Sequence, residues 1–245
     1  MTYRRILAPL AAIITCASAA QAQAPIYAWD FSSGFNPIVG TATGTANGPG
    51  ASVSGGVLNL DGTGYVQYDG HLVPTSGSYS VSLFFKQGGP PAGIEEWISQ
   101  GSSGGPGFYM GTNGGSGFRM TDSWVNPTGN SGFNANSPDW HNYVLTVDPT
   151  NAWFYIDGVL AATRGGTITT TNGGTNTRFG AQFFDTEFVN GQLDDIQIYD
   201  STLSANDVML LSEHQSLTTT PEPASMVLVG TGLLGVAVLA RRRRS

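Results

Sequence analysis

Pairs of Asp or Asn followed by Gly recur along the sequence and limit the fold more than any other feature. Such pairs favour the tight turns between antiparallel strands, because they reach positive φ angles at low cost. Glycine supplies 34 of the 245 residues, about twice the usual share of ~7%. The pairs are Asp61-Gly62, Asp69-Gly70, Asn113-Gly114, Asp157-Gly158, Asn172-Gly173 and Asn190-Gly191. So many turns predict a chain of short strands.

Short runs of aromatic and β-branched residues lie between these turns. In Tyr79–Phe85, apolar residues alternate with serines, which is typical of a strand with one face in a core. The predicted strands are Val57–Leu60, Tyr65–Tyr68, Tyr79–Phe85, Trp97–Ser99, Phe108–Met110, Tyr143–Val147, Trp153–Ile156 and Leu193–Tyr199. One helix is predicted from Ser204, a favourable N-cap, to about Ser212 or His214. This pattern predicts an all-β, two-sheet antiparallel sandwich or jelly roll with one short C-terminal helix.

The N-terminus has the pattern of a cleavable signal helix. Arg4 and Arg5 precede a short apolar run that ends in small residues. Two Ala-x-Ala sites overlap at residues 20–22 and 22–24, but the second would leave Pro25 first, so we expect signal peptidase to remove residues 1–22. Cys16, the only cysteine, is lost with them, and the mature chain then forms no disulfide.

The C-terminus has three parts in order. Pro221, Glu222 and Pro223 precede the apolar residues 224–240, and four arginines follow. At ~1.5 Å per residue the apolar stretch is about 25 Å long, near the thickness of a hydrocarbon core, and is predicted to be a transmembrane helix. The arginines should stay in the cytoplasm. The predicted organisation is a domain at residues 23–216, a linker at 217–220 and a tail at 221–245.

This tail resembles the PEP-CTERM sorting signal of Gram-negative bacteria. The resemblance implies that Pro221, Glu222 and Pro223 are read by an exosortase. It also implies export across the inner membrane, anchoring by the tail, and later a place at the cell surface or in the extracellular matrix. An ordinary single-span anchor is the alternative, and it predicts the same topology.

The charge of the exported part argues against nucleic acid as a partner. Of 10 Lys and Arg, six lie in the two ends, and of 17 Asp and Glu only Glu222 does, so 4 and 16 remain, a net charge of −12. Nucleic-acid affinity rests on clustered Lys and Arg, which this part lacks. Acidity of this kind suits cation binding and solubility outside the cell.

An ordered set of segments resembles the laminin-G-like, concanavalin A-like jelly-roll domains of bacterial surface proteins. The segments are residues 58–66, 79–86, 139–148, 154–160, 178–180 and 191–200, followed by Leu203-Ser204. Together they cover residues 28–211, nearly the whole mature domain. The resemblance implies a jelly roll that binds a glycan, and often a structural calcium ion (Ca2+) at the sandwich edge.

The same resemblance indicates candidate site residues. Aromatic rings that stack on sugars are expected among Tyr109, Trp124, Trp153 and Phe184, although core packing is the more frequent place for a large aromatic. For calcium, which prefers several hard oxygens, Asp194 and Asp195 match the acidic pair of the family, and Asp30 could lie alongside. An acidic strand end that is only hydrated is the equal alternative.

Motifs for catalysis are missing or lack their context. Glucanases of this fold carry a Glu-x-Asp-x-x-Glu run, which is absent from the sequence. Glu95 and Glu96 would point to opposite faces of a strand, and Asp185 and Glu187 are expected in a solvated turn. Gly101–Gly105 fits the elbow of serine hydrolases, but Pro106 follows it where a helix is required.

The sequence therefore predicts a non-enzymatic, exosortase-sorted surface or matrix protein that binds a polysaccharide. Two alternatives remain: an adhesive protein that contacts other proteins and has no sugar site, and a divergent glycoside hydrolase. A jelly-roll fold alone does not decide among them.

Replacing Glu222 tests the sorting prediction. In Glu222→Ala, we expect the full-length chain to accumulate in the inner membrane, because the exosortase loses the central residue of its motif. Immunoblots of fractionated cells check this, and equal processing of variant and wild type would refute it.

Overall fold

The computed structural model describes residues 23–91, 93–101, 107–114, 117–121, 123–126, 137–166, 175–183 and 185–213. Within them the first strands are β1 (Tyr27–Trp29), β2 (Gly44–Asn47), β3 (Ala51–Ser54), β4 (Val57–Asp61), β5 (Tyr65–Asp69), β6 (Tyr79–Gln87), β7 (Glu95–Gln100) and β8 (Phe108–Thr112). The later elements are β9 (Phe118–Met120), β10 (Ser123–Val125), β11 (His141–Val147), β12 (Asn151–Ile156), β13 (Val159–Gly165), β14 (Asn176–Phe179), β15 (Asn190–Tyr199) and the helix α1 (Ala205–Ser212).

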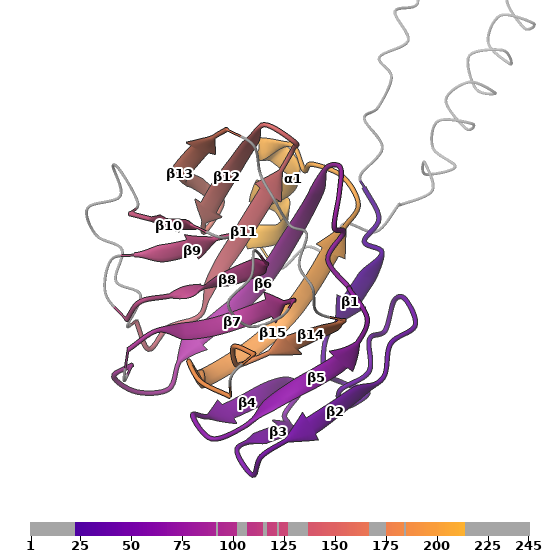
Figure 1. Cartoon of the computed structure of the whole chain (residues 1–245), viewed down its shortest axis with the longest axis vertical. Helices are drawn as coiled ribbons and strands as arrows, with labels where there is room; N and C mark the ends of the chain where they lie inside the picture. Colours follow the sequence, from indigo (N-terminus) through magenta and orange to yellow (C-terminus); the bar gives the residue numbers. More distant parts are fainter. Residues whose placement is uncertain are drawn as a thin grey trace, which may run out of the picture.

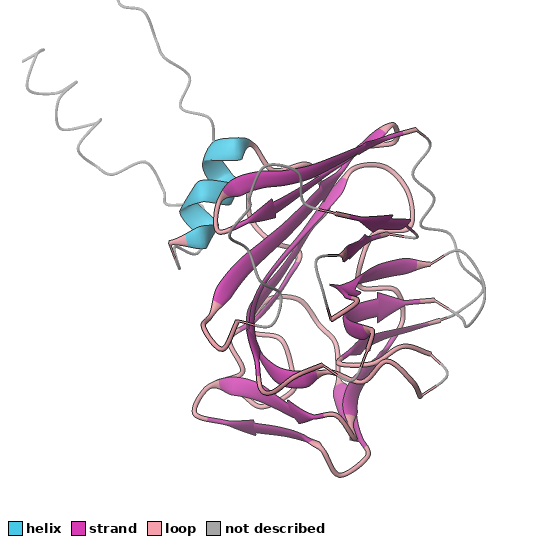
Figure 2. Cartoon of the chain, turned by 90° about the vertical axis from the view of Figure 1, so that its left-hand side faces the viewer, coloured by secondary structure: helices cyan, strands magenta, loops and turns pink. Residues whose placement is uncertain are grey.

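The described strands form two antiparallel sheets packed face to face (Figure 1). Sheet A has the order β13-β12-β11-β6-β15-β4-β3, and β1 also pairs with β15. Sheet B has the order β10-β9-β8-β7-β14-β5-β2. The long strand β15 pairs with β4 along its first residues and with β1 along its last. Viewed from the side, α1 covers the outer face of one sheet (Figure 2).

One apolar core fills the space between the sheets. Trp97 of β7 lies near its middle, with its ring centroid 4.4 Å from that of Tyr143 and 4.9 Å from that of Phe85. Trp97 is fully buried, although its indole N–H has no hydrogen-bond partner among the described residues. Large aromatic rings of this kind provide much of the hydrophobic stabilisation of a sandwich.

All eight predicted strands are present, most of them one or two residues longer than expected. The prediction missed short strands such as β2 and β3, because their residues are small, polar and largely exposed and show no apolar alternation. β6 alternates as predicted, yet its serines are buried too. Ser80 Oγ donates to the carbonyl of Ser201, because the chain after β15 covers that face.

The helix α1 begins as the sequence predicts. Ser204 Oγ accepts a hydrogen bond from the backbone N–H of Asp207, and the Asp207 carboxylate accepts one from the backbone N–H of Ser204. This reciprocal capping box satisfies two backbone donors that the first turn would otherwise leave open. Val208 and Leu211 of α1 then pack on Val144 and Tyr199, on the outer face of sheet A.

Removing the cap should loosen this end of the domain. We expect Ser204→Ala to lower the free energy of unfolding by about 1 kcal/mol, since the first turn loses its acceptor. Urea unfolding followed by circular dichroism measures the effect. Ser204→Thr, which keeps the hydroxyl, is the matched control, and equal stability of all three proteins would contradict the capping account.

Candidate functional site

Two of the four predicted aromatic residues meet at one arginine on the outer face of sheet B. The guanidinium carbon of Arg119 lies 3.9 Å from the ring centroid of Tyr109 and 5.4 Å from that of Trp124. Tyr109 is buried beneath Arg119, whereas Trp124 is 41% exposed. A cation over an aromatic face is an attractive contact, and it fixes the position of the exposed indole.

The other two predicted aromatic residues do not join this cluster. Trp153 is half-buried on the outer face of sheet A, where it lines a cavity of about 200 Å³ with Asp148 and Tyr155. Phe184 lies outside the described residues. The structure therefore brings Tyr109 and Trp124 together and places Trp153 on the opposite side of the sandwich.

The predicted calcium residues are near one another along the backbone. Asp30 directly follows Trp29, which pairs with Ile196, and Asp195 directly precedes Ile196. Asp30 Oδ1, however, accepts hydrogen bonds from the N–H and hydroxyl of Ser32, and Asp194 Oδ1 accepts one from the N–H of Asp195. No group of three His, Cys, Asp or Glu residues placed to hold a metal is found in the described part of the chain. Calcium here stays a prediction.

A charged cluster that the sequence did not predict lies beside the aromatic residues. Arg119 Nη1 is 2.5 Å from Glu96 Oε1 and 3.7 Å from Glu187 Oε2. The Glu96 side chain is fully buried, and Glu187 keeps 23% exposure. Gly111, opposite Glu96 on β8, leaves room for this carboxyl, because a Cβ there would lie 2.9 Å from Glu96 Oε2.

The cluster holds more carboxyls than cations. Burial raises the pKa of Glu96 to about 8, Arg119 opposes that shift, and the neighbouring Glu187 carboxyl adds to it. Because this pKa lies above neutral pH, the Glu96 carboxyl keeps its proton at pH 7. Glu187 is thus partly buried, in contrast to the solvated turn that we predicted for it, whereas Asp185 is largely exposed.

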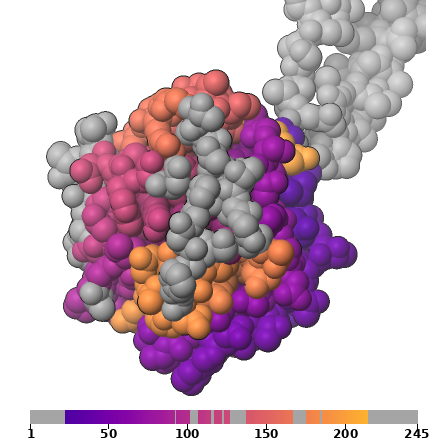
Figure 3. Space-filling view, in the orientation of Figure 1, coloured from indigo at the N-terminus to yellow at the C-terminus, as the bar shows by residue number. Residues whose placement is uncertain are grey.

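The described residues of segment 180–189, which leave out Phe184, form a loop that brings Glu187 to this face. The N–H of Gly180 donates to the carbonyl of Trp97, and the N–H of Glu96 donates to the carbonyl of Glu187. Arg178 also binds the loop through the carbonyl of Gln182 and the carboxylate of Asp185. In Figure 3, orange surface from the chain after β13 lies between the pink middle strands and the purple N-terminal strands. The loop is therefore held against β7 over the outer face of sheet B.

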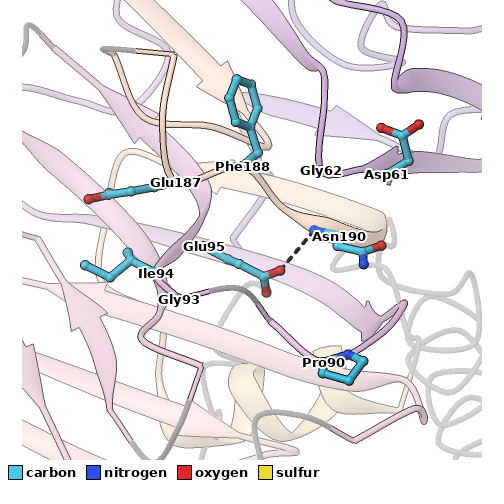
Figure 4. A pocket seen from close by; sticks show the side chains of 9 residues that line it. All are labelled: Asp61, Gly62, Pro90, Gly93, Ile94, Glu95, Glu187, Phe188 and Asn190. Atoms are coloured by element: carbon cyan, nitrogen blue, oxygen red, sulfur yellow. Dashed lines mark hydrogen bonds between the residues drawn. The ribbon is translucent and has the colours of Figure 1, made fainter.

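Glu95, the neighbour of Glu96, lines a pocket of about 560 Å³ at the edge of the sandwich. Its Oε1 accepts hydrogen bonds from the N–H of Asn190 at 3.0 Å and from Nε2 of Gln87 at 3.2 Å. Burial raises the pKa of Glu95, and these two donors oppose the shift. Figure 4 shows its carboxyl pointing toward Asn190 inside the pocket, with the carboxyl of Glu187 turned away.

Two smaller cavities adjoin this pocket. A cavity of about 280 Å³ shares Asp61 with it, and one of about 330 Å³ shares Pro90; the two smaller cavities share Gly88. We call the three together the edge groove. Its lining is mainly glycine, proline and side chains with carboxyl or amide groups. A groove of this composition offers many hydrogen bonds to a hydroxyl-rich ligand.

A family model agrees with this architecture. The model of the concanavalin A-like lectin/glucanases superfamily matches residues 60–209, more than half of the chain. The chain belongs to this superfamily. The matched part of the concanavalin A-like domain runs from β4 into α1 and includes the aromatic cluster and the Glu95 pocket. No curated protein sequence matches the chain.

Solved structures share the fold of this concanavalin A-like domain. Domain 4 of AbnA, a GH43 extracellular arabinanase from Geobacillus stearothermophilus in complex with arabinotriose, has a TM-score of 0.57 and 19% identity over 78% of this chain and 100% of that one. The binding domain of botulinum neurotoxin DC, in complex with SialylT, has a TM-score of 0.59 and 17% identity over 80% and 52% of the two chains. This chain thus spans about half of the neurotoxin domain. At these identities the likeness shows the fold alone.

The C-terminal tail is confirmed as a sorting signal. Residues 219–244 match the PEP-CTERM protein-sorting motif, which includes Pro221, Glu222 and Pro223. This motif indicates export and membrane-associated sorting in Gram-negative bacteria. The predicted signal peptide at 1–22 and the predicted span at 224–240 lie outside the described residues. In the described part of the chain, no helix has the length and apolar character needed to cross a membrane.

The buried Glu96 carboxyl should make the free energy of unfolding depend on pH. The folded chain keeps the Glu96 proton up to about pH 8, whereas the unfolded chain loses it near the ordinary value of 4.5. Stability from this group is therefore fully present below about pH 4.5 and is lost as pH rises toward about 8. We expect Glu96→Gln to flatten the decline of the unfolding free energy in urea titrations between these pH values. The exposed Asp200→Asn should retain the wild-type slope, and an unchanged slope in Glu96→Gln would contradict the raised pKa of Glu96.

Proposed function

We propose that this chain is a secreted, exosortase-processed surface or matrix protein whose concanavalin A-like domain binds polysaccharide without cleaving it. The observations that carry the proposal are the exposed ring of Trp124 beside Arg119 and the edge groove lined by carboxyl and amide side chains. In this account, signal peptidase and an exosortase process the two ends, the tail anchors the chain in the membrane during sorting, and the domain acts at the cell surface or in the matrix.

The row of residues across sheet B has the dimensions of a sugar-chain site. Glu96 pairs with Gly111, Gly111 with Arg119, and Arg119 with Trp124, so the row crosses four neighbouring strands. At ~4.8 Å between strands, the distance from Glu96 to Trp124 is about 14 Å. The exposed indole lies at one end of this row, and at the other end Glu95, next to the buried Glu96, lines the edge groove. An indole and a polar groove at this separation suit a short stretch of polysaccharide, since sugars stack on rings and bind polar groups through their hydroxyls.

The superfamily and the solved structures support this proposal. Two of the similar structures are complexes whose ligands are arabinotriose and SialylT. Domain 4 of the arabinanase AbnA, in its complex with arabinotriose, shows that the fold occurs as one domain of a protein that acts on sugars. We infer sugar binding by this chain from its own groove and its exposed indole, because a shared fold alone does not establish a ligand.

Catalysis is the weaker explanation of the carboxyl pair. Glycosidases use two carboxyl groups on either side of the scissile bond. Glu96 lies beside Glu187 and has a raised pKa, which is the feature that favours a hydrolase. The Glu96 side chain has no exposed surface, however, and Arg119 occupies its free side. We therefore assign the pair to holding the loop of residues 180–189 in place.

Adhesion to another protein is a second candidate. Val159 and Leu160, at the end of the β12–β13 hairpin, are 58% and 47% exposed, and Met209 of α1 is 48% exposed. A Cβ on Gly158 would lie 3.4 Å from the Cα of Met209, so hairpin and helix are neighbours. Such an exposed apolar patch suits a protein partner better than a sugar.

Replacing each of two tryptophans by alanine tests the proposed site. The binding partner in this test is the extracellular polysaccharide of the bacterium that produces the protein. We expect Trp124→Ala to weaken binding of the mature chain to it about tenfold, because one stacked ring contributes roughly 1–1.5 kcal/mol. Trp153→Ala, on the outer face of sheet A, is the matched control and should bind as wild type does. Titration calorimetry measures both.

The same titrations distinguish the alternatives. Saturable binding without release of sugar fragments supports the proposal, and release of reducing ends favours the hydrolase. Loss of binding in Trp153→Ala but not in Trp124→Ala would place the site on sheet A and contradict the proposal. Repeating the titration with calcium and with a chelator tests the predicted calcium ion on Asp30, Asp194 and Asp195, on which no step here depends.

A further inference from the structure

The Glu95 carboxyl has one oxygen that the described residues leave without a hydrogen bond. Glu95 is only 2% exposed, and its Oε1 is bound by Asn190 and Gln87. Its Oε2 is buried with no hydrogen-bond partner in the described part of the chain. A buried acceptor left unsatisfied is costly and unusual in a native fold, and it points to a donor that the protein itself does not supply.

The pocket around this oxygen is acidic and lacks a cation. Asp61 also lines it, whereas the carboxyl of Glu187 is turned away (Figure 4), and no Lys, Arg or His is among its described lining residues. Arg119, which contacts Glu187 from the sheet side, is already bound to Glu96. A donor that carries a positive charge is therefore favoured over a neutral one, because an opposite charge stabilises the ionised form of a buried carboxyl.

The same pocket has an apolar side. Phe188, Ile94 and Pro90 line it together with the carboxyl groups (Figure 4). The ring of Phe188 is half-buried, with its centroid 6.3 Å from that of Tyr65. The volume of about 560 Å³ lies in the range of small-ligand pockets. An apolar wall beside a carboxyl fits a ring with a C–H face and one protonated amine.

We propose that the Glu95 pocket binds an amino sugar through its free primary amine, with Glu95 as the acceptor and Asp61 as a second negative charge. This inference rests on the proposed function, since it names the sugar class that the polysaccharide contains. It predicts a preference for deacetylated hexosamine chains, because acetylation removes the charge and replaces the ammonium with an amide too bulky for a hydrogen bond to a buried oxygen.

Three oligosaccharides of equal length test the inference on the mature chain by titration calorimetry. These are a glucosamine hexamer, an N-acetylglucosamine hexamer and a neutral glucose hexamer, with a lysine hexamer as the probe of charge alone. We expect the glucosamine hexamer to bind about tenfold more tightly than the other two sugars, the range of one charge-assisted hydrogen bond.

Variants of single carboxyls connect that preference to the pocket. Glu95→Gln keeps an acceptor for Asn190 and Gln87 but loses the charge, and it should lower the affinity ratio between the glucosamine and N-acetylglucosamine hexamers from about ten to about one. Asp61→Asn should lower the preference for the glucosamine hexamer by a smaller factor than Glu95→Gln does. Asp200→Asn removes the same charge at the other end of β15 and should leave the preference unchanged. Thermal melts of each variant confirm folding.

The outcomes separate this inference from the proposed function. Equal binding of the three sugars, with loss in Trp124→Ala, overturns the amine site and leaves polysaccharide binding intact. Absence of binding to any sugar overturns both. Tighter binding of the lysine hexamer than of the glucosamine hexamer, or an amine preference that Glu95→Gln leaves intact, also overturns the inference.

Discussion

Burial of two consecutive glutamates in β7 determines the arrangement of the site. Glu95 and Glu96 are 2% and 0% exposed, and a carboxyl placed out of water must be neutralised, paired or hydrogen-bonded. A bulge between Glu96 and Ile98 inserts Trp97 into the core and leaves the two glutamates in different surroundings. Glu96 is compensated by Arg119 and Glu187, and that contact holds the loop of residues 180–189 over sheet B. Glu95 is compensated by Asn190 and Gln87 through one oxygen only. We therefore assign a structural role to Glu96, whose neighbours are Arg119 and Glu187. Glu95, which has an oxygen without a hydrogen bond among the described residues, faces the groove.

The sequence predicted the sandwich because its signals are local. Alternation in Tyr79–Phe85, the turn pair at Asp157-Gly158 and the cap at Ser204 each depend on a few neighbouring residues, and each is confirmed.

The site depends on contacts between distant segments, so it could be predicted only in part. Tyr109 and Trp124 were expected, but the arginine that joins them was not. Glu95 and Glu96 were recognised as facing opposite sides, which is correct, yet nothing in the sequence marked Glu187 as their neighbour, 91 or more positions away in the chain. Acidic residues inside a strand were the available signal, since charged side chains are rarely buried without a partner.

Sorting and binding are connected by position and charge. The PEP-CTERM motif indicates export and membrane-associated sorting. Under the proposed function, the acidic domain with its few basic residues then acts outside the cytoplasm. The groove lies at the start of β15, whereas α1 and the tail follow the other end of that strand. A chain held by its tail can thus present the groove away from its point of attachment. This arrangement suits a protein that connects a cell envelope to a surrounding polymer.

Hydrogen exchange of the mature chain with and without the host extracellular polysaccharide tests the central claim most directly. If the edge groove and the neighbouring face of sheet B form the binding site, amides in residues 87–95, 118–125 and 187–192 exchange more slowly in the complex. Amides around Trp153 and Thr163, on sheet A, keep their rates. Slower exchange confined to the sheet A face, or no change anywhere in the domain, would contradict the account.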